Sequence, residues 1–285
     1  MKKLILFLSL SLFSLLANAT ELVSLIQTYQ ADRGALGRLY THRLSSEYFA
    51  RMESFNKDYL KTLQAQNYAS LSEDGKVDYV LFRNYLEKQL AELDLEKRDF
   101  IQIQSVLEFG KPLEAFTISR RRAVQPNAQA LAAQWNVVAQ DLAAQHKALA
   151  NSTKYDSWQK AELAAQAVES LHKVVKESYD FYFDFDPAFT WWMPTPWEKL
   201  DSGMKAYAKA LRTHYTNSVK DDGSGIIGKP IGREALEKQL AYEMIAYSPE
   251  ELIAEAEKQF AWCEKEMLKA SNELGFGNDW KAALE

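Results

Sequence analysis

Apolar side chains recur at every third or fourth position along much of this chain, which is the spacing of one face of an α-helix. Charged residues fill the positions between them, so each run predicts a helix with one apolar and one solvated face. The sequence therefore predicts an all-α protein, a multi-helix array of long amphipathic helices. The clearest runs are Tyr79, Phe82, Leu86, Leu90 and Leu93; Val168, Leu171, Val175, Tyr179 and Tyr182; and Ile253, Ala256, Phe260, Cys263, Met267, Ala270 and Leu274.

Prolines and hydroxyl residues predict where several helices begin. No proline precedes Pro112, which leaves residues 21–109 free to form two or three long helices. Thr195-Pro196-Trp197-Glu198 and Ser248-Pro249-Glu250-Glu251 both have the pattern of a capping box with proline at the first helical position. Asp156-Ser157-Trp158-Gln159 is a weaker version of the same signal.

The last residues predict a helix that has only just begun. Gly275 and Gly277 are expected to close the helix that begins after Ser248, and Asn278 or Asp279 is expected to cap the next one. A helix of one or two turns gains few hydrogen bonds for the residues that it fixes, so it is not stable alone. We therefore expect this chain to be the leading part of a larger protein.

The first nineteen residues have the pattern of a secretory signal peptide. Met1-Lys2-Lys3 is basic, Leu4–Leu16 is apolar apart from three serines, and Ala17-Asn18-Ala19 offers a small-residue cleavage site. The apolar run is shorter than the roughly 20 residues that a membrane-spanning helix needs. A signal anchor is the alternative. We expect cleavage after Ala19 and a periplasmic or secreted protein.

Charge and cysteine content exclude several partners. Removal of the leader takes away two of 34 basic residues and leaves 32 against 39 acidic ones, a net charge of −7. Such a chain is a poor candidate for binding nucleic acid or an anionic membrane surface, so we expect neither partner after cleavage. Cys263 is the sole cysteine, so no internal disulfide can form. On the apolar run it is expected to be a buried, inert thiol.

Glycines suggest one internal boundary. Four of the eleven glycines fall between Asp221 and Gly232, which is typical of a turn-rich loop. The predicted organisation is a helical domain over residues 20–220, a Gly-rich loop over 221–232, and the start of a second helical part over 233–285.

A zinc-peptidase site is absent from the sequence pattern. The usual motif, H-E-x-x-H, places two imidazoles on successive turns of one helix with Glu as general base. No two histidines here are four apart, and the four are followed by Arg43, Lys147, Lys173 and Tyr215. His172 lies beside an apolar run, where a packed, hydrogen-bonded histidine is expected. Ser224 lacks the spacing of a nucleophile elbow. We expect no catalytic residue and no metal ligand in this chain.

Two aromatic-rich positions are candidates for lining a cleft. Asp184 and Asp186 could form a carboxylate pair for acid–base work or cation binding; the alternative is that Asp186-Pro187 ends a helix and the nearby aromatics fill a corner. Trp191 and Trp192 could line a ligand cleft, or else pack in the core.

Arginines form a third candidate. Arg120 and Arg121, in Arg120-Arg121-Arg122, have the planar geometry to grip a substrate carboxylate. The alternative is a solvated loop.

Three stretches taken together resemble the bacterial family known as domain of unknown function 885. They are residues 71–79, residues 185–192, and residues 228–252 continuing to Gly275-Phe276-Gly277. Members of that family are helical proteins, exported or cytosolic, that carry an H-E-x-x-H helix in their C-terminal half and are similar to zinc-dependent oligopeptidases and carboxypeptidases. The resemblance implies a helical metallopeptidase-like fold that encloses a cleft.

The metal ligands and catalytic Glu of that family have no counterpart in this chain, so none is carried over. The resemblance implies zinc for full-length members and no cofactor in these residues. It also implies that the chain is the non-catalytic N-terminal part, with peptide substrate or the missing C-terminal half as partners. The alternative is a self-sufficient helical module of the cell envelope that binds peptides or another partner.

Overall fold

The computed structural model describes residues 22–216 and 230–284 of the chain. The expected cleavage site at Ala19 and most of the predicted Gly-rich loop lie outside these residues. Two compact units are present, Met1–Ile227 and Gly228–Glu285. The regular structure in the described ranges is helical, apart from one isolated β-bridge between Tyr155 and Tyr215, so the predicted all-α class is confirmed. No described helix is both long and apolar enough to span a membrane.

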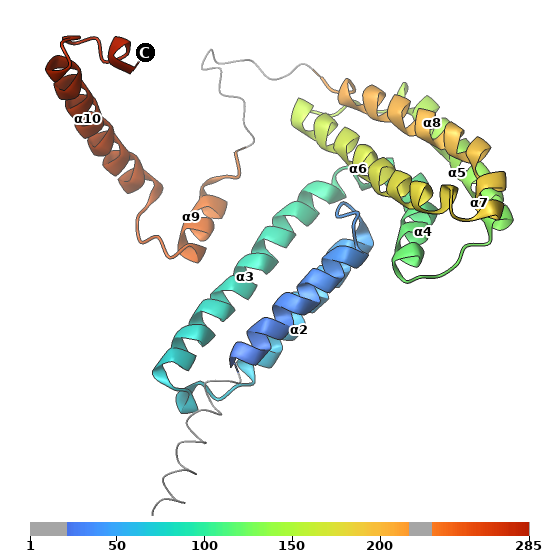
Figure 1. Cartoon of the computed structure of the whole chain (residues 1–285), viewed down its shortest axis with the longest axis horizontal. Helices are drawn as coiled ribbons and strands as arrows, with labels where there is room; N and C mark the ends of the chain where they lie inside the picture. The colour runs from blue at the N-terminus through green and yellow to red at the C-terminus, as the bar shows by residue number, and fades with distance from the viewer. Residues whose placement is uncertain (1–21, 217–229, 285) are drawn as a thin grey trace, which may run out of the picture. The chain divides into compact units, whose positions relative to one another are not determined.

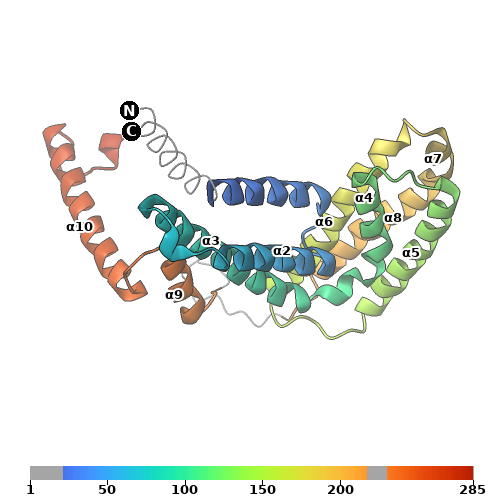
Figure 2. The same cartoon turned by 90° about the horizontal axis from the view of Figure 1, so that it is seen from below.

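The first unit begins with three long helices, as the absence of early prolines predicts. They are a first helix over residues 22–39, α2 (Ser46–Gln64) and α3 (Glu73–Ile101). The Ser45 hydroxyl caps α2 by accepting from the Tyr48 amide, and Ser72 caps α3 in the same way through Gly75. A short 3₁₀ turn, η1 (Tyr68–Ser70), joins α2 to α3, and these two helices lie side by side (Figures 1 and 2).

The apolar run of α3 forms the contact with its neighbours. Tyr79, Phe82, Leu86 and Leu93 are buried, as their spacing predicts. At the solvated side of the same contact, Glu53 of α2 accepts from Lys57 at 2.6 Å and from Lys97 of α3 at 2.8 Å. The apolar run therefore sets which face of α3 is covered, and the ion pairs border it.

The rest of the first unit is a bundle in which α8 packs against both α5 and α6 (Figure 1). Its longest helix, α6, buries Val168, Leu171, Val175, Tyr179 and Tyr182 as predicted. The elements are η2 (Gln104–Gly110), α4 (Lys111–Arg121), α5 (Ala128–Leu149), α6 (Trp158–Phe183), α7 (Pro187–Trp192) and α8 (Pro194–Arg212).

Stacked rings hold α6 against α8. His172 stacks on Trp197 at 5.6 Å between ring centroids, Trp197 stacks on Tyr179 at 4.9 Å, and Tyr179 stacks on Phe183 at 5.3 Å. His172 also bonds through Nε2 to Oδ1 of Asp201 at 2.7 Å. The prediction of a packed, hydrogen-bonded His172 is confirmed.

One of the three predicted capping boxes is formed as predicted, and the start at Asp156-Ser157-Trp158-Gln159 is displaced by one residue, since Ser157 rather than Asp156 is the cap. Ser157 caps α6, and Ser248 forms a complete capping box with Glu251 at the start of α10 (Pro249–Glu273). The prediction for Thr195 is wrong, because α8 begins at Pro194 and the carbonyl of Met193 already accepts a helical bond from the Trp197 amide at 2.9 Å. The chain passes from α7 into α8 with one residue between them, which places Thr195 inside the first turn.

The second unit contains α9 (Arg233–Tyr242), α10 and η3 (Ala282–Leu284). Gly275 and Gly277 follow α10 with φ of +86° and +60°, a conformation that L side chains avoid, so they end the helix as predicted. The Asp279 carboxylate then accepts from the Ala282 amide at 3.1 Å, which makes it the cap of the last short turn.

The apolar run of α10 is the part of the fold that departs most from expectation. Ile253 is 60% exposed, Phe260 73% and Leu274 65%, and Cys263 is exposed as well. The prediction that Cys263 is a buried thiol is therefore wrong. Periodicity shows which face of a helix is apolar, and within the described part of this unit most of that face of α10 is left uncovered, with Met267 alone of the run half-buried.

Candidate functional site

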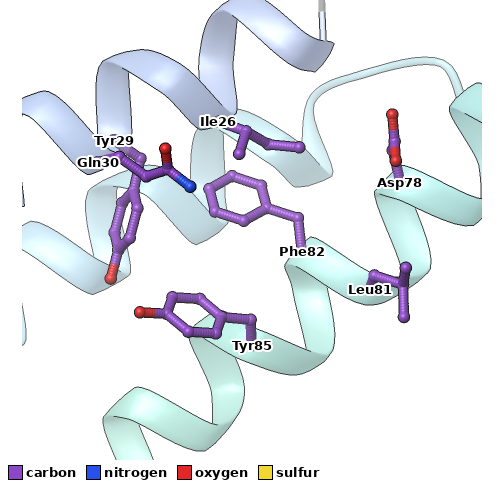
Figure 3. A pocket seen from close by; sticks show the side chains of 7 residues that line it. All are labelled: Ile26, Tyr29, Gln30, Asp78, Leu81, Phe82 and Tyr85. Carbon is purple, nitrogen blue, oxygen red and sulfur yellow. The ribbon is translucent and has the colours of Figure 1, made fainter.

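A cavity of about 350 Å³ lies between the first helix and α3 (Figure 3). Its lining comes from two short helical faces, because residues three or four apart point to the same side of a helix. The first helix contributes Ile26, Tyr29 and Gln30, and α3 contributes Asp78, Leu81, Phe82 and Tyr85. This volume falls in the range of small-ligand pockets, which is roughly 300–1,000 Å³.

Aromatic packing fixes the wall of this cavity. Tyr29 is only 1% exposed, and its ring stacks on Phe55 at 5.1 Å. Edge contacts join the same ring to Tyr59 at 5.1 Å, Phe82 at 5.3 Å and Tyr85 at 5.8 Å. Because a ring held on several sides cannot change rotamer without disturbing its neighbours, the wall is rigid before any ligand arrives.

The hydroxyl of Tyr29 is part of a buried hydrogen-bond chain. It donates to Oδ1 of Asn56 at 2.9 Å, and Nδ2 of Asn56 donates to the Met52 carbonyl at 2.8 Å. Burial raises the pKa of Tyr29 above its ordinary value, so the hydroxyl keeps its proton. Tyr59 donates to Oδ2 of Asp32 at 2.7 Å, and burial followed by this bond raises the pKa of Tyr59 to about 12.

A cationic side chain, Arg33, lies at one end of the cavity and is hydrogen-bonded to residues of α3. Arg33 donates to the hydroxyl of Tyr85 and to Oε1 of Gln89. Its guanidinium carbon also lies 5.8 Å from the centre of the Tyr85 ring, within the range of a cation–π contact. The Tyr85 end of the cavity is therefore held in place by a positive group.

The other end carries a carboxylate. Asp78 is half-buried, and among the described residues its carboxylate has no hydrogen-bond or ion-pair partner. Figure 3 shows Asp78 apart from the rings of Tyr29 and Tyr85. Asp78 and Tyr85 are seven positions apart on α3, which corresponds to about 10 Å along a helix. The cavity is thus an apolar slot with an acidic end, suited to binding and orienting a ligand.

A second cavity, of about 380 Å³, lies beside α4 and α5. It has no ionisable side chain in its lining, so it offers less to recognise a ligand than the first. Its lining consists of Pro112, Ala115, Phe116, Ser119, Val124, Pro126, Asn127, Ala130, Leu131 and Gln134.

The two carboxylates singled out in the sequence, Asp184 and Asp186, have different surroundings in the structure. Asp186 is the cap of α7: its Oδ1 accepts from the amides of Ala188 at 2.9 Å and Phe189 at 3.1 Å, and its Oδ2 accepts from Gln125 at 2.7 Å. Asp184 follows the last residue of α6 and is exposed. Asp186 therefore has a structural role at the α6–α7 corner.

Of the arginines, Arg120 is partly buried and Arg121 is exposed, both in the last turn of α4. Arg120 donates from Nε to the Ser178 hydroxyl at 3.2 Å and lies 5.0 Å over the ring of Phe181. Burial lowers the pKa of Arg120 below its ordinary value. The Arg triplet belongs to the end of a helix rather than to a loop.

The tryptophans of α7 are on the surface. Trp191 is 80% exposed and Trp192 is 42% exposed, whereas Phe189 of the same helix is fully buried. None of the six residues singled out in the sequence lines either of the two cavities. Helical spacing is the only sequence signal of the residues that line the first cavity, such as Tyr29 and Asp78. This spacing does not reveal which helices pack against each other.

The histidines of the described residues are spread over the first unit. His42 bonds through Nδ1 to Oε1 of Glu114 at 3.1 Å, and His214 contacts the Ser152 hydroxyl through Nε2 at 3.0 Å. No group of three or more His, Cys, Asp or Glu side chains gathers to hold a metal ion among the residues that the structure describes.

The chain was compared with protein families, curated proteins and solved structures. No curated protein and no solved structure matches it. The model of the family described as bacterial protein of unknown function (DUF885) matches residues 28–285, which cover both units. The chain therefore belongs to the DUF885 family.

Proposed function

We propose that this chain is the non-catalytic, N-terminal part of an exported zinc-peptidase-like protein. The observation that carries the proposal is the uncovered apolar face of α10, with Ile253, Phe260 and Leu274 on it. Full burial of such a side chain is worth about 1.5–3 kcal/mol, so a face of this kind favours a large apolar partner. In this proposal the partner is a C-terminal half that bears the H-E-x-x-H helix.

The proposal divides the chemistry between the two halves. Zinc, held by the C-terminal half, would lower the pKa of a bound water so that it can attack a peptide bond. The residues of this chain would hold the peptide: the rigid aromatic wall around Tyr29 and the acidic end at Asp78 lie on the long helices of the first unit. Residues 1–19 would direct the protein out of the cytoplasm, which N-terminal sequencing of the exported protein would test.

The association is testable with the full chain and the separately produced H-E-x-x-H-bearing half of a longer family member. We expect a 1:1 complex in analytical ultracentrifugation, and zinc-dependent peptide cleavage that neither half shows alone. Phe260→Glu should weaken the complex by about 30-fold, because a buried aromatic anchor is typically worth 2 kcal/mol or more.

Ala254→Glu is the matched control. It adds the same charge to an exposed position of α10, which is rotated by about 120° around the helix from Phe260. The proposal fails if the halves do not associate, or if both variants weaken the complex equally.

A second function is supported by the cavity itself, which is complete within the first unit. A self-sufficient binding module would bind peptides with the same affinity whether or not the second half is present. Peptide titrations of the chain alone and of the complex separate this function from the first.

A further inference from the structure

We infer that the cavity between the first helix and α3 binds the side chain of a lysine or arginine of a peptide, with its cationic end at Asp78. The inference takes from the proposed function only that the ligand is a peptide. The residue type that the cavity selects follows from its own shape and charge.

The shape suits a long, unbranched side chain. Ile26, Leu81 and Phe82 are the aliphatic and phenyl side chains of the lining, and Leu81 and Phe82 lie one helical turn after Asp78 on α3 (Figure 3). Lysine and arginine side chains bury their methylene stems on apolar surface and keep the charged head at a polar edge. A short or branched side chain would fill the slot without reaching the carboxylate.

The charges select the cation and its direction. Asp78 is half-buried, and an ammonium or guanidinium would give its carboxylate the charge-assisted partner that it otherwise lacks among the described residues. Arg33 lies at the opposite end, bound to Tyr85 and Gln89. A second cation is disfavoured beside Arg33, so the positive head is directed to the Asp78 end, whereas an acidic side chain is repelled there.

The rigidity of the wall favours this selection. Phe82 contacts the ring of Tyr29, which three further aromatic residues, Phe55, Tyr59 and Tyr85, also hold in place. A preformed slot does not have to be ordered when the side chain enters, so less of the interaction energy is lost on binding.

The test uses the full chain and three end-blocked fluorescent pentapeptides that differ at the central residue: lysine, norleucine or glutamate. Norleucine has the same stem as lysine without the charge. By fluorescence anisotropy we expect the lysine peptide to bind about tenfold more tightly than the norleucine peptide, in line with a hydrogen bond to a charged group. The glutamate peptide should bind most weakly.

Variants at two aspartates of α3 identify the site. Asp78→Asn should reduce the affinity for the lysine peptide to that for the norleucine peptide, and Asp78→Lys should favour the glutamate peptide. Asp74→Asn, an exposed aspartate one turn earlier that does not line the cavity, should leave all three affinities unchanged. Circular dichroism checks that each variant is folded.

Several results would overturn the inference. They are equal affinities of wild type for the lysine and norleucine peptides, an equal effect of the Asp78 and Asp74 variants, or no binding of any peptide. Association through α10 is measured without these peptides, so a failure of the cavity assay leaves the proposed function standing. If the chain does not associate with the second half but still selects the lysine peptide, the inference about the cavity stands and the proposed function fails.

Discussion

Tyr29→Phe tests whether the wall of the cavity depends on one buried hydrogen bond. The substitution keeps the ring that contacts Phe55 and removes the hydroxyl that donates to Asn56 at 2.9 Å. Asn56 is 3% exposed, so its Oδ1 would be left in the interior without a donor. Such an unsatisfied group costs about 1–3 kcal/mol. We expect a loss of that size in the free energy of unfolding, measured by urea unfolding with circular dichroism.

Two further variants isolate the cause. Tyr59→Phe removes a hydroxyl whose acceptor, Asp32, is exposed and can be solvated by water, so the loss should stay below about 1 kcal/mol. Tyr29→Phe combined with Asn56→Leu replaces both partners by apolar groups of similar shape and should recover most of the loss. Equal losses for Tyr29→Phe and Tyr59→Phe, or a double variant as unstable as the sum of its parts, would refute the reasoning.

Three other predictions concern packing and pH. Hydrogen bonds from its two lysine partners lower the pKa of Glu53 to about 2, so these ion pairs stabilise the fold above a pH of about 4.5 and are lost as the pH falls toward 2. Glu53→Gln should flatten acid unfolding in that window, and an unchanged curve would contradict this. Burial raises the pKa of Tyr179 to about 12, so stability present below a pH of about 10 is lost as the pH rises to 12; Tyr179→Phe should reduce this alkaline loss, as followed by circular dichroism. Gly110→Ala would place a methyl group 2.5 Å from Cδ2 of Leu171 and should lower the thermal midpoint by an amount equivalent to about 1–3 kcal/mol; a neutral result would mean that Leu171 can move aside.

Local signals in the sequence were sufficient for most of the helices. The apolar runs of α3 and α6 and the capping box at Ser248 depend on residues within one or two turns of each other, and all three are confirmed. The predicted cap of α8 at Thr195 is wrong because only Met193 separates α7 from α8, and α8 already begins at Pro194. The run of α10 shows the limit of periodicity, which identifies an apolar face but not what covers it.

The residues that line the candidate site could not be predicted from the sequence for a related reason. Ile26 and Asp78 line one cavity, yet about 50 positions separate them, and no local pattern brings them together. Nothing in the sequence distinguishes Asp78 from the many other carboxylates of this acidic chain. The aromatic neighbours of Asp186 suggest a site in the sequence, whereas the structure shows Asp186 as a helix cap. Its role follows from the amides that happen to lie beside it.

The most direct measurement is the affinity between this chain and an H-E-x-x-H-bearing half, for wild type and for Phe260→Glu and Ala254→Glu. The account predicts a complex that only Phe260→Glu weakens, since Phe260 alone of these two residues lies on the uncovered apolar run of α10. No measurable association with the second half, or an affinity that Phe260→Glu leaves unchanged, would contradict it.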